Sequence, residues 1–366
     1  MSNAVLGEFK HALAPAVSLV KNNANNIEYL KLLGGIYHGL QQYDMAIKSF
    51  NRALKINSRD FQTLSNIASS YKEVHKYDEA EEHYKQSLAV QLNQPDALTN
   101  YGLLMQQNAK LDEAITLHKK ALQLMPEHPS AEYNLAYALN EKGANDESLQ
   151  TYMKVIEKTP YHVRALCDIA HIYGKLKQPE NSLPYLERAA QVAPEDEHVH
   201  LNLGITHRMM KNLDLAETSL NRVLQINPDN QTAKYFLAII NGDDSISSSP
   251  DEYVQNLFDG YAETFDEQLI NQLQYKTPEL IGDMVNKHTD LLKKYNILDL
   301  GCGTGLAGIY LESISEHMVG IDLSEKMLKK AAERNIYDEL ITTGIDQYYE
   351  SHNIKPHIVV SADVFV

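Results

Sequence analysis

The chain has 366 residues, 43% of them apolar and 22% charged, so it is long enough for two folded domains and too apolar for wholesale disorder. Its 33 Lys and Arg residues face 49 Asp and Glu residues, and a formal net charge of −16 argues against nucleic acid as a partner. The first 21 residues show no signal-peptide pattern, no apolar run reaches 18 residues, and there are only two cysteines, which predicts a cytoplasmic protein with no membrane partner and no structural disulfide. The 15 scattered histidines predict no metal site.

After an N-terminal helix expected within residues 1–26, the sequence repeats with a constant step of 34 residues. Small residues recur at Gly34, Ala68, Gly102, Ala136, Ala170 and Gly204, and again twelve residues later at Ala46, Ala80, Ala114, Ser148, Ser182 and Ala216. A mostly large column, with Phe50, Tyr84, Tyr152 and Leu186, precedes a third column of mostly small residues. Small side chains let two helices approach closely, so each unit is predicted to be a helical hairpin.

Prolines end the later units, at Pro126, Pro160, Pro194 and Pro228. The pattern resembles the tetratricopeptide repeat, with six units over residues 27–230 and a capping helix at 231–241. This resemblance implies an all-α superhelix whose inner groove, lined by the first helix of each repeat, binds a protein or peptide.

One inward column of the repeats consists almost entirely of carboxamides: Asn66, Asn100, Asn134, Asp168 and Asn202. A carboxamide both donates and accepts hydrogen bonds, so such a column can pair with the main chain of an extended peptide. It resembles the asparagine ladder in the repeats of O-linked N-acetylglucosamine transferase. Asparagine is also frequent at this position in the repeat family generally, so a purely structural role stays open.

Residues 242–250 are rich in turn formers and mark a linker between domains. Two helices are expected at about 251–273 and 277–290, within an entry segment 251–295. The run from Phe258 to Asp266 resembles the entry helices of methyltransferases, where aromatic residues form a lid. Tyr261 and Phe265 are therefore candidates for lining a substrate or cofactor pocket, with plain packing as the alternative.

Over residues 296–366 the pattern changes to strand, helix, strand, helix, strand, strand. The expected elements are 296–300, 305–314, 317–322, 325–334, 339–342 and 357–361. Such alternation predicts an α/β Rossmann-like domain with a parallel sheet. Only the first four strands of such a fold are expected, which suggests a fragment of a longer gene product, with a truncated pseudoenzyme as the alternative.

The first of these strands runs into a glycine-rich turn, Gly301-Cys-Gly-Thr-Gly305, and the second ends in Asp322. Glycines let a ligand approach the backbone, and an acid at the neighbouring strand end can accept the hydroxyls of a ribose. A dinucleotide requires Gly-x-Gly-x-x-Gly, but Leu306 occupies the place of the third glycine. A dinucleotide is therefore disfavoured.

The stretch Leu298–Gly305 resembles the first motif of class I S-adenosylmethionine-dependent methyltransferases, and Gly320–Ser324 resembles their second. The resemblance implies S-adenosylmethionine as cofactor. The residues it assigns to the cofactor are Asp299, Gly301, Cys302, Gly303 and Gly305 in the bend, Asp322 for the ribose, Leu323 for the adenine, and Asp346 as a weaker adenine contact. Cys302 would contribute its backbone rather than a nucleophilic thiol.

The sequence limits the possible methyl acceptors but does not identify one. The segment after the fourth strand, Ser361-Ala-Asp-Val364, lacks the Pro-Pro-aromatic signature of nucleobase amino-methylating enzymes, and Asp363 is a weak candidate near the transferring methyl group. Methyl transfer depends mostly on in-line positioning, so no general base is required. The sequence thus favours a methyltransferase acting on a protein, peptide or small metabolite. The alternative is a repeat adaptor whose second domain is vestigial or senses cofactor.

Overall fold

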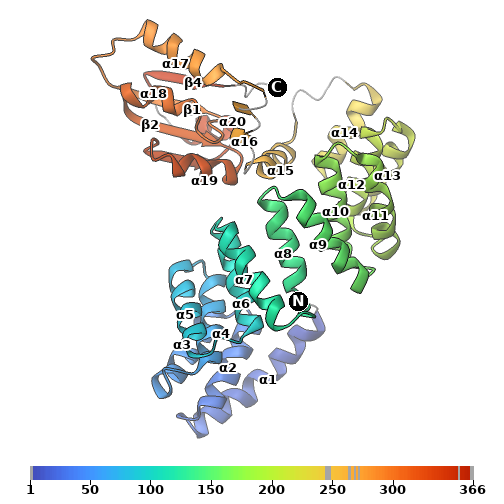
Figure 1. Ribbon diagram of the computed structural model, residues 1–366, viewed down its shortest axis with the longest axis vertical. Helices are drawn as coiled ribbons and strands as arrows, with labels where there is room; N and C mark the ends of the chain where they lie inside the picture. Colours follow the sequence, from blue (N-terminus) through green and yellow to red (C-terminus); the bar gives the residue numbers. More distant parts are fainter. Residues whose placement is uncertain are drawn as a thin grey trace. The chain divides into compact units, whose positions relative to one another are not determined.

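The computed structural model describes residues 3–243, 249–262, 265–267, 269–270, 273–352 and 355–362. The chain forms two compact units, Met1–Ile172 and Tyr173–Val366, whose boundary lies within helix α10. All regular secondary structure described before residue 244 is helical (Figure 1). They are α1 (Asn3–Asn22), α2 (Ile27–Gly39), α3 (Tyr43–Ile56), α4 (Phe61–Glu73), α5 (Tyr77–Val90), α6 (Pro95–Gln107), α7 (Leu111–Leu124), α8 (Ala131–Glu141), α9 (Asn145–Lys158), α10 (Val163–Lys175), α11 (Pro179–Val192), α12 (Glu197–Met209), α13 (Leu213–Ile226) and α14 (Gln231–Asn241).

The expected helical repeat is confirmed, because helices α2 to α13 fill the six 34-residue units with two helices in each. The two columns pack as the sequence predicts. A Cβ built on Gly34 would lie 2.5 Å from the ring of Phe50, and one on Gly102 would lie 2.5 Å from the ring of His118. The small column therefore exists because the large column fills the same space.

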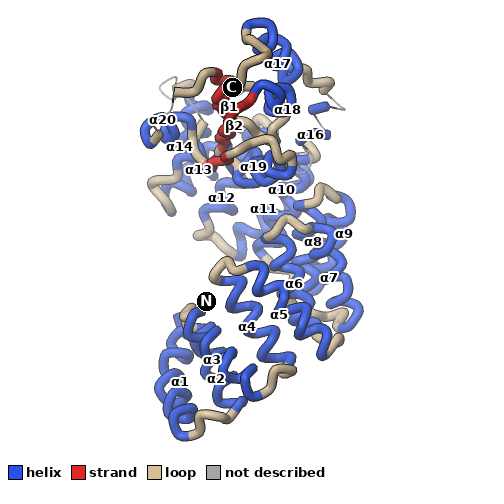
Figure 2. Tube along the Cα trace, turned by 90° about the vertical axis from the view of Figure 1, so that its left-hand side faces the viewer, coloured by secondary structure: helices blue, strands red, loops and turns tan. Residues whose placement is uncertain are grey.

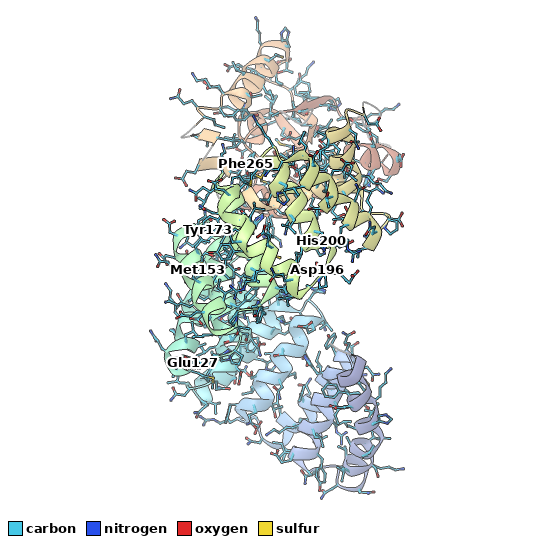
Figure 3. The ribbon with its side chains drawn as sticks, turned by 90° about the vertical axis from the view of Figure 1, so that its right-hand side faces the viewer. Glu127, Met153, Tyr173, Asp196, His200 and Phe265 are labelled. Atoms are coloured by element: carbon cyan, nitrogen blue, oxygen red, sulfur yellow. The ribbon has the colours of Figure 1, made fainter. Side chains whose placement is uncertain are left out.

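Helix ends in this region follow ordinary capping chemistry. The Asp196 side chain accepts hydrogen bonds from the backbone N–H groups of His198 and Val199 at the start of α12 (Figure 3). Asn26 and Asn230 cap α2 and α14 in the same way. The column prolines follow the ends of α7, α9, α11 and α13.

All strands of the described chain lie in the C-terminal part, where Figure 2 shows them in red. They form one parallel sheet of order β3-β2-β1-β4. The elements are α15 (Asp251–Tyr261), α16 (Phe265–Glu267), α17 (Thr277–His288), β1 (Tyr295–Leu300), α18 (Gly308–Leu311), the 3-10 turn η2 (Glu312–Ile314), β2 (Ser315–Asp322), α19 (Glu325–Glu333), β3 (Glu339–Thr342), α20 (Ile345–Ser351) and β4 (Ile358–Ser361). The Rossmann-like α/β class is confirmed for this region.

The sheet has a separate core on each face. Ile297 and Met318 pack with Leu311 of α18 and with residues of α17 on one face. Leu298 and Ile321 pack with α20 on the other face, where Tyr348 is fully buried. Since side chains alternate along a strand, β1 and β2 contribute to both cores.

Three element predictions need correction. Residues 251–273 do not form one helix, since α15 ends at Tyr261 and α16 begins at Phe265. The helix expected from residue 305 begins only at Gly308, because Gly305 keeps a left-handed φ of 84°. Helix α20 was not predicted. It has seven residues, of which only Tyr348 is buried, so its sequence shows little helical periodicity.

Helix α15 packs against the last helix of the repeat region. The Tyr253 ring meets the Phe236 ring of α14 edge-on, with centroids 5.1 Å apart. This contact joins two elements of the same compact unit across residues 242–250. None of the helices in the described ranges is long and apolar enough to cross a bilayer.

Candidate cofactor site

The turn after β1 is bent by three glycines in the left-handed region. Gly301, Gly303 and Gly305 have φ values of 62°, 55° and 84°. The nearest atom to a Cβ built on Gly303 is a ring carbon of Phe265, 3.9 Å away. The backbone at Gly303 is therefore bare, which lets another molecule approach it closely.

Asp322, at the end of β2, meets this bend directly. Its Oδ2 accepts a hydrogen bond from Gly303 N at 2.9 Å, and its Oδ1 accepts one from Ser324 N at 2.8 Å. The neighbouring backbone of Cys302 donates to Ile321 O at 2.9 Å. Burial raises the pKa of Asp322, and Asp259 adds to the rise, while the backbone N–H bonds lower it. No ion pair to Asp322 occurs within the described ranges.

Tyr337, in the turn between α19 and β3, supports the bend from beneath. Cβ atoms built on Gly305 and Gly308 would lie 2.9 Å and 2.6 Å from atoms of its side chain. A Cβ on Gly320 of β2 would also lie 2.9 Å from the ring. These three glycines therefore make room for a tyrosine. Sequence reasoning missed Tyr337, because it lies in no motif.

Asp299 and Cys302 are buried beneath the bend. The Tyr337 hydroxyl donates to Asp299 Oδ2 at 2.7 Å, and Asp299 Oδ1 is buried without a partner among the described residues. Burial raises the pKa of Asp299 to about 7, and the Asp322 charge adds to the rise. Burial also raises the pKa of the Cys302 thiol, which keeps the sulfur protonated and unsuited to nucleophilic attack.

Two Phe-Asp dipeptides, seven residues apart, attach the entry segment to the bend. Asp259 accepts a hydrogen bond from the Ser324 hydroxyl beside Asp322. Asp266 accepts one from the Thr304 hydroxyl and pairs with Arg334. The sequence contains this signal as Phe258-Asp259 and Phe265-Asp266, but the lid resemblance points only to the aromatic residues and not to the two acids.

The remaining predicted residues are placed unevenly around the bend. Phe265 lies over Gly303 and meets Phe258 edge-on. Tyr261 lies toward Tyr253, whose pKa is raised by burial and, to a smaller extent, by Tyr235 and Tyr261. Leu323 lies beside Gly344, and Asp346 is an exposed residue in the first turn of α20. Asp363 lies outside the described residues.

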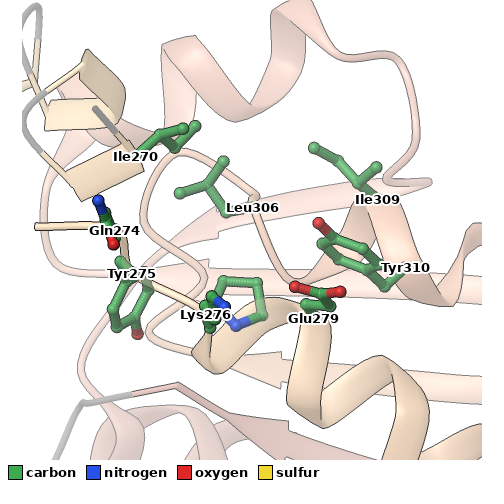
Figure 4. Close-up of a pocket in the computed structure, with 9 residues that line it drawn as sticks. Ile270, Gln274, Tyr275, Lys276, Glu279, Leu306, Ile309 and Tyr310 are labelled. Carbon is green, nitrogen blue, oxygen red and sulfur yellow. The ribbon is translucent and has the colours of Figure 1, made fainter.

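A pocket of about 380 Å³ opens beside the bend, between the segment before α17 and the start of α18. Figure 4 shows Ile270, Leu306 and Ile309 along one side and Lys276 and Glu279 along the other. Leu306 directly follows Gly305, so the pocket adjoins the bend, and Asp322 is not among the residues that line it.

Comparison with known families agrees with both halves of this description. Tetratricopeptide-repeat families match residues 29–93, 59–127, 103–167 and 175–240. A methyltransferase-domain family matches residues 297–357, which include the bend, Asp322 and Tyr337. The chain joins tetratricopeptide repeats to a methyltransferase domain.

Individual relatives match either half. An 18S rRNA (guanine-N(7))-methyltransferase of Bos taurus is 43% identical over 51 residues, which are 14% of this chain and 18% of that protein. Its counterpart in Arabidopsis thaliana is 32% identical over 78 residues, 21% of this chain and 27% of that protein. The chain thus spans well under a third of the length of these relatives.

Solved structures resemble the repeats. Pseudomonas aeruginosa pilF covers 58% of this chain and 97% of its own at a TM-score of 0.52 and 18% identity. PilW, a type IV pilus biogenesis factor, covers 59% and 98% at a TM-score of 0.53 and 18% identity. At such identities the likeness shows the fold alone.

The amide column of the tetratricopeptide repeats lies on the first helix of successive hairpins, α4, α6, α8, α10 and α12. Asn66 is exposed, Asn100 and Asn202 are half-buried, and Asn134 is buried. Within the described residues none of these four amides has a hydrogen-bond partner, whereas Asp168 accepts two tyrosine hydroxyls.

Proposed function

We propose that the methyltransferase domain binds S-adenosylmethionine and transfers its methyl group to a protein, peptide or small metabolite, while the repeats recruit the substrate or a partner. The observation that carries the proposal is the contact between Asp322 and Gly303, 2.9 Å from Oδ2 to N. It brings a carboxylate with spare lone pairs to a bare backbone bend, which suits a nucleoside ligand.

The residues at the bend fit this cofactor by charge as well as by shape. Bound S-adenosylmethionine would supply an electrophilic methyl group on a cationic sulfonium. Asp299, with a buried Oδ1 that lacks a partner, and Asp322 would both favour a cationic ligand. Gly301 and Gly303 would admit its methionine end, Asp322 would accept its ribose hydroxyls, and Leu323 would face its adenine.

The class of methyl acceptor is proposed from the net charge of the protein. The named activity of the rRNA methyltransferase relatives raises rRNA as an acceptor, but those matches span at most 78 residues. A net charge of −16 repels a polyphosphate backbone. The repeats instead support a protein or peptide as the recruited molecule.

Calorimetry with S-adenosylmethionine on the full-length protein tests the proposal. We expect binding by the native protein and at least a roughly 100-fold loss in Asp322→Ala, about 2.8 kcal/mol. Asp283→Ala, which removes an exposed carboxylate on α17, is the matched control and should change affinity far less. Absence of binding by the native protein would favour the adaptor function. Incubation with methyl-labelled cofactor and cell extract would then locate the acceptor.

A further inference from the structure

Asp168 is the one carboxylate in the amide column, and its surroundings differ from those of the other members. It lies half-buried on α10, and its Oδ2 accepts the hydroxyls of Tyr133 and Tyr152, each at 2.9 Å. Together with Tyr137 and His162, these residues form what we call the Asp168 cluster. All five belong to the compact unit Met1–Ile172.

The carboxylate of Asp168 has no cation paired with it in the described part of the chain. Burial raises the pKa of Asp168, while the two tyrosine hydrogen bonds and then the nearby His162 and Arg164 lower it. Neither His162 nor Arg164 forms an ion pair with Asp168. Both tyrosine hydrogen bonds go to Oδ2, so Oδ1 receives none from the described residues. Oδ1 is also not sealed from solvent. A half-buried carboxylate with an available oxygen favours a cationic partner.

An aromatic stack lies beside this carboxylate. The Tyr133 ring stacks on His162 with centroids 4.9 Å apart, and Tyr137 stacks on Tyr133 at 6.5 Å. Tyr137 is 38% exposed, so part of its side chain is accessible to a partner. Aromatic faces attract ammonium groups and, more strongly, the flat guanidinium of arginine.

We propose that the Asp168 cluster binds a basic side chain, arginine or lysine, from an extended segment of the protein partner. The inference rests on the proposed recruiting role of the repeats and specifies the chemistry of the recruited segment. The side chain would stack on Tyr137 and pair with Asp168 Oδ1. The neighbouring amides of Asn100 and Asn134 would bond the segment's main chain. The net charge of −16 favours a basic partner over an acidic one, and an acidic segment would bring a like charge to Asp168.

Selection from a random dodecapeptide library on the full-length protein tests this without a known partner. The native protein should enrich peptides with Arg or Lys at a fixed place. Asp168→Asn should lose that enrichment, although the amide still accepts the tyrosine hydroxyls and restores the regular column. Asp146→Asn, an exposed change in the first turn of α9 with the same effect on net charge, should keep it.

A second measurement separates recognition from folding. A peptide selected by the native protein, and its Arg→Gln or Lys→Gln version, would be titrated against both proteins. The native protein should prefer the basic peptide by roughly tenfold, and Asp168→Asn should bind the two equally. Equal binding by the native protein, an unchanged preference in Asp168→Asn, or no enrichment of basic residues would overturn the proposal. Cofactor calorimetry on the same samples shows separately whether the methyltransferase function holds.

Discussion

In the repeats Gly34 and Gly102 lie under the rings of Phe50 and His118, and in the methyltransferase domain Gly305 lies under Tyr337. The two regions share this way of packing a ring against a backbone. Both regions also contain residues with left-handed φ values, such as Gln41 and His75 in the repeats and the glycines of the bend. They differ in buried charge, because Asp299 beneath the bend is the one Asp or Glu that is buried among the described residues.

The two regions therefore differ in the kind of ionisable group that they bury. The repeats bury polar side chains too, but their buried ionisable groups are histidines such as His118, which burial keeps neutral. At the bend the buried ionisable group is an acid, because Asp299 has a raised carboxylate pKa and a buried oxygen without a partner among the described residues. Poorly solvated acids of this kind are typical of functional sites.

The largest expected effect comes from Asp299→Asn. Because burial raises the folded-state pKa from 3.8 to about 7, the folded domain binds this proton more tightly than the unfolded chain does. Stability contributed by Asp299 is therefore greatest below about pH 4 and falls as the pH rises to about 7. Asparagine should remove this loss and stabilise the domain at pH 8 by up to about 4 kcal/mol. Pulse proteolysis in urea would measure this change in the free energy of unfolding, with mass spectrometry following the peptides from residues 295–361.

The control for Asp299→Asn is the same measurement at pH 4, where the two proteins should be equally stable. If Asp299→Asn were destabilising at pH 8, the carboxylate would be held in its charged form by a contact that asparagine cannot make. The contrast between the two regions would then lose its main support.

His118→Phe is the matching change in the repeats and has the opposite pH dependence. Burial lowers the pKa of His118 from 6.5 to about 4, so the imidazole is neutral in the folded repeat. Its stability contribution is present above about pH 6.5 and is lost as the pH falls toward 4. Phenylalanine already fills the equivalent place at residue 50. His118→Phe should therefore reduce the loss in free energy of unfolding between neutral and acidic pH by up to about 3 kcal/mol. Urea unfolding at pH 7 and pH 4.5 measures this; an unchanged difference between the two pH values would contradict it.

Gly305→Ala and Gly242→Ala separate backbone strain from packing. Both glycines have left-handed φ values, 84° and 66°, but nothing lies within 4 Å of a Cβ on Gly242. Gly242→Ala should cost about 1 kcal/mol, the strain alone. Gly305→Ala should cost about 2 kcal/mol more, because the added methyl meets Tyr337. Equal losses in urea unfolding would show that Tyr337 moves freely and does not support the bend.

Much of the repeat region could be predicted, because each packing position recurs once per 34 residues. Six copies of one pattern outweigh local ambiguity, and the capping helix begins and ends at the predicted residues, 231 and 241. The entry segment offered a single apolar stripe. The apolar residues of that stripe pack against two different surfaces, with Tyr253 against Phe236 and Phe265 over Gly303. The apolar spacing therefore extends beyond Tyr261, where α15 ends, and does not reveal the end of the helix.

The bend and Asp322 could also be placed from sequence, since adjacent parallel strands end at the same edge. Tyr337 could not, because it bonds Asp299 from 38 residues away and follows no motif. Asp259 lies 65 residues from Ser324, and only the folded chain shows that they meet. Contacts of this range are set by tertiary packing, which local patterns do not encode.

The smallest effect compares two helix caps. Asn26 caps α2 by accepting from Tyr29 N at 3.1 Å, and Ser324 caps α19 by accepting from Met327 N at the same distance. Replacing either with alanine should cost about 1 kcal/mol. Ser324→Ala also removes the donor to Asp259, so hydrogen exchange in α15 should accelerate in that variant and stay unchanged in Asn26→Ala. Equal exchange in both would mean that α15 is held by its contacts with α14 and not by the loop beside Asp322.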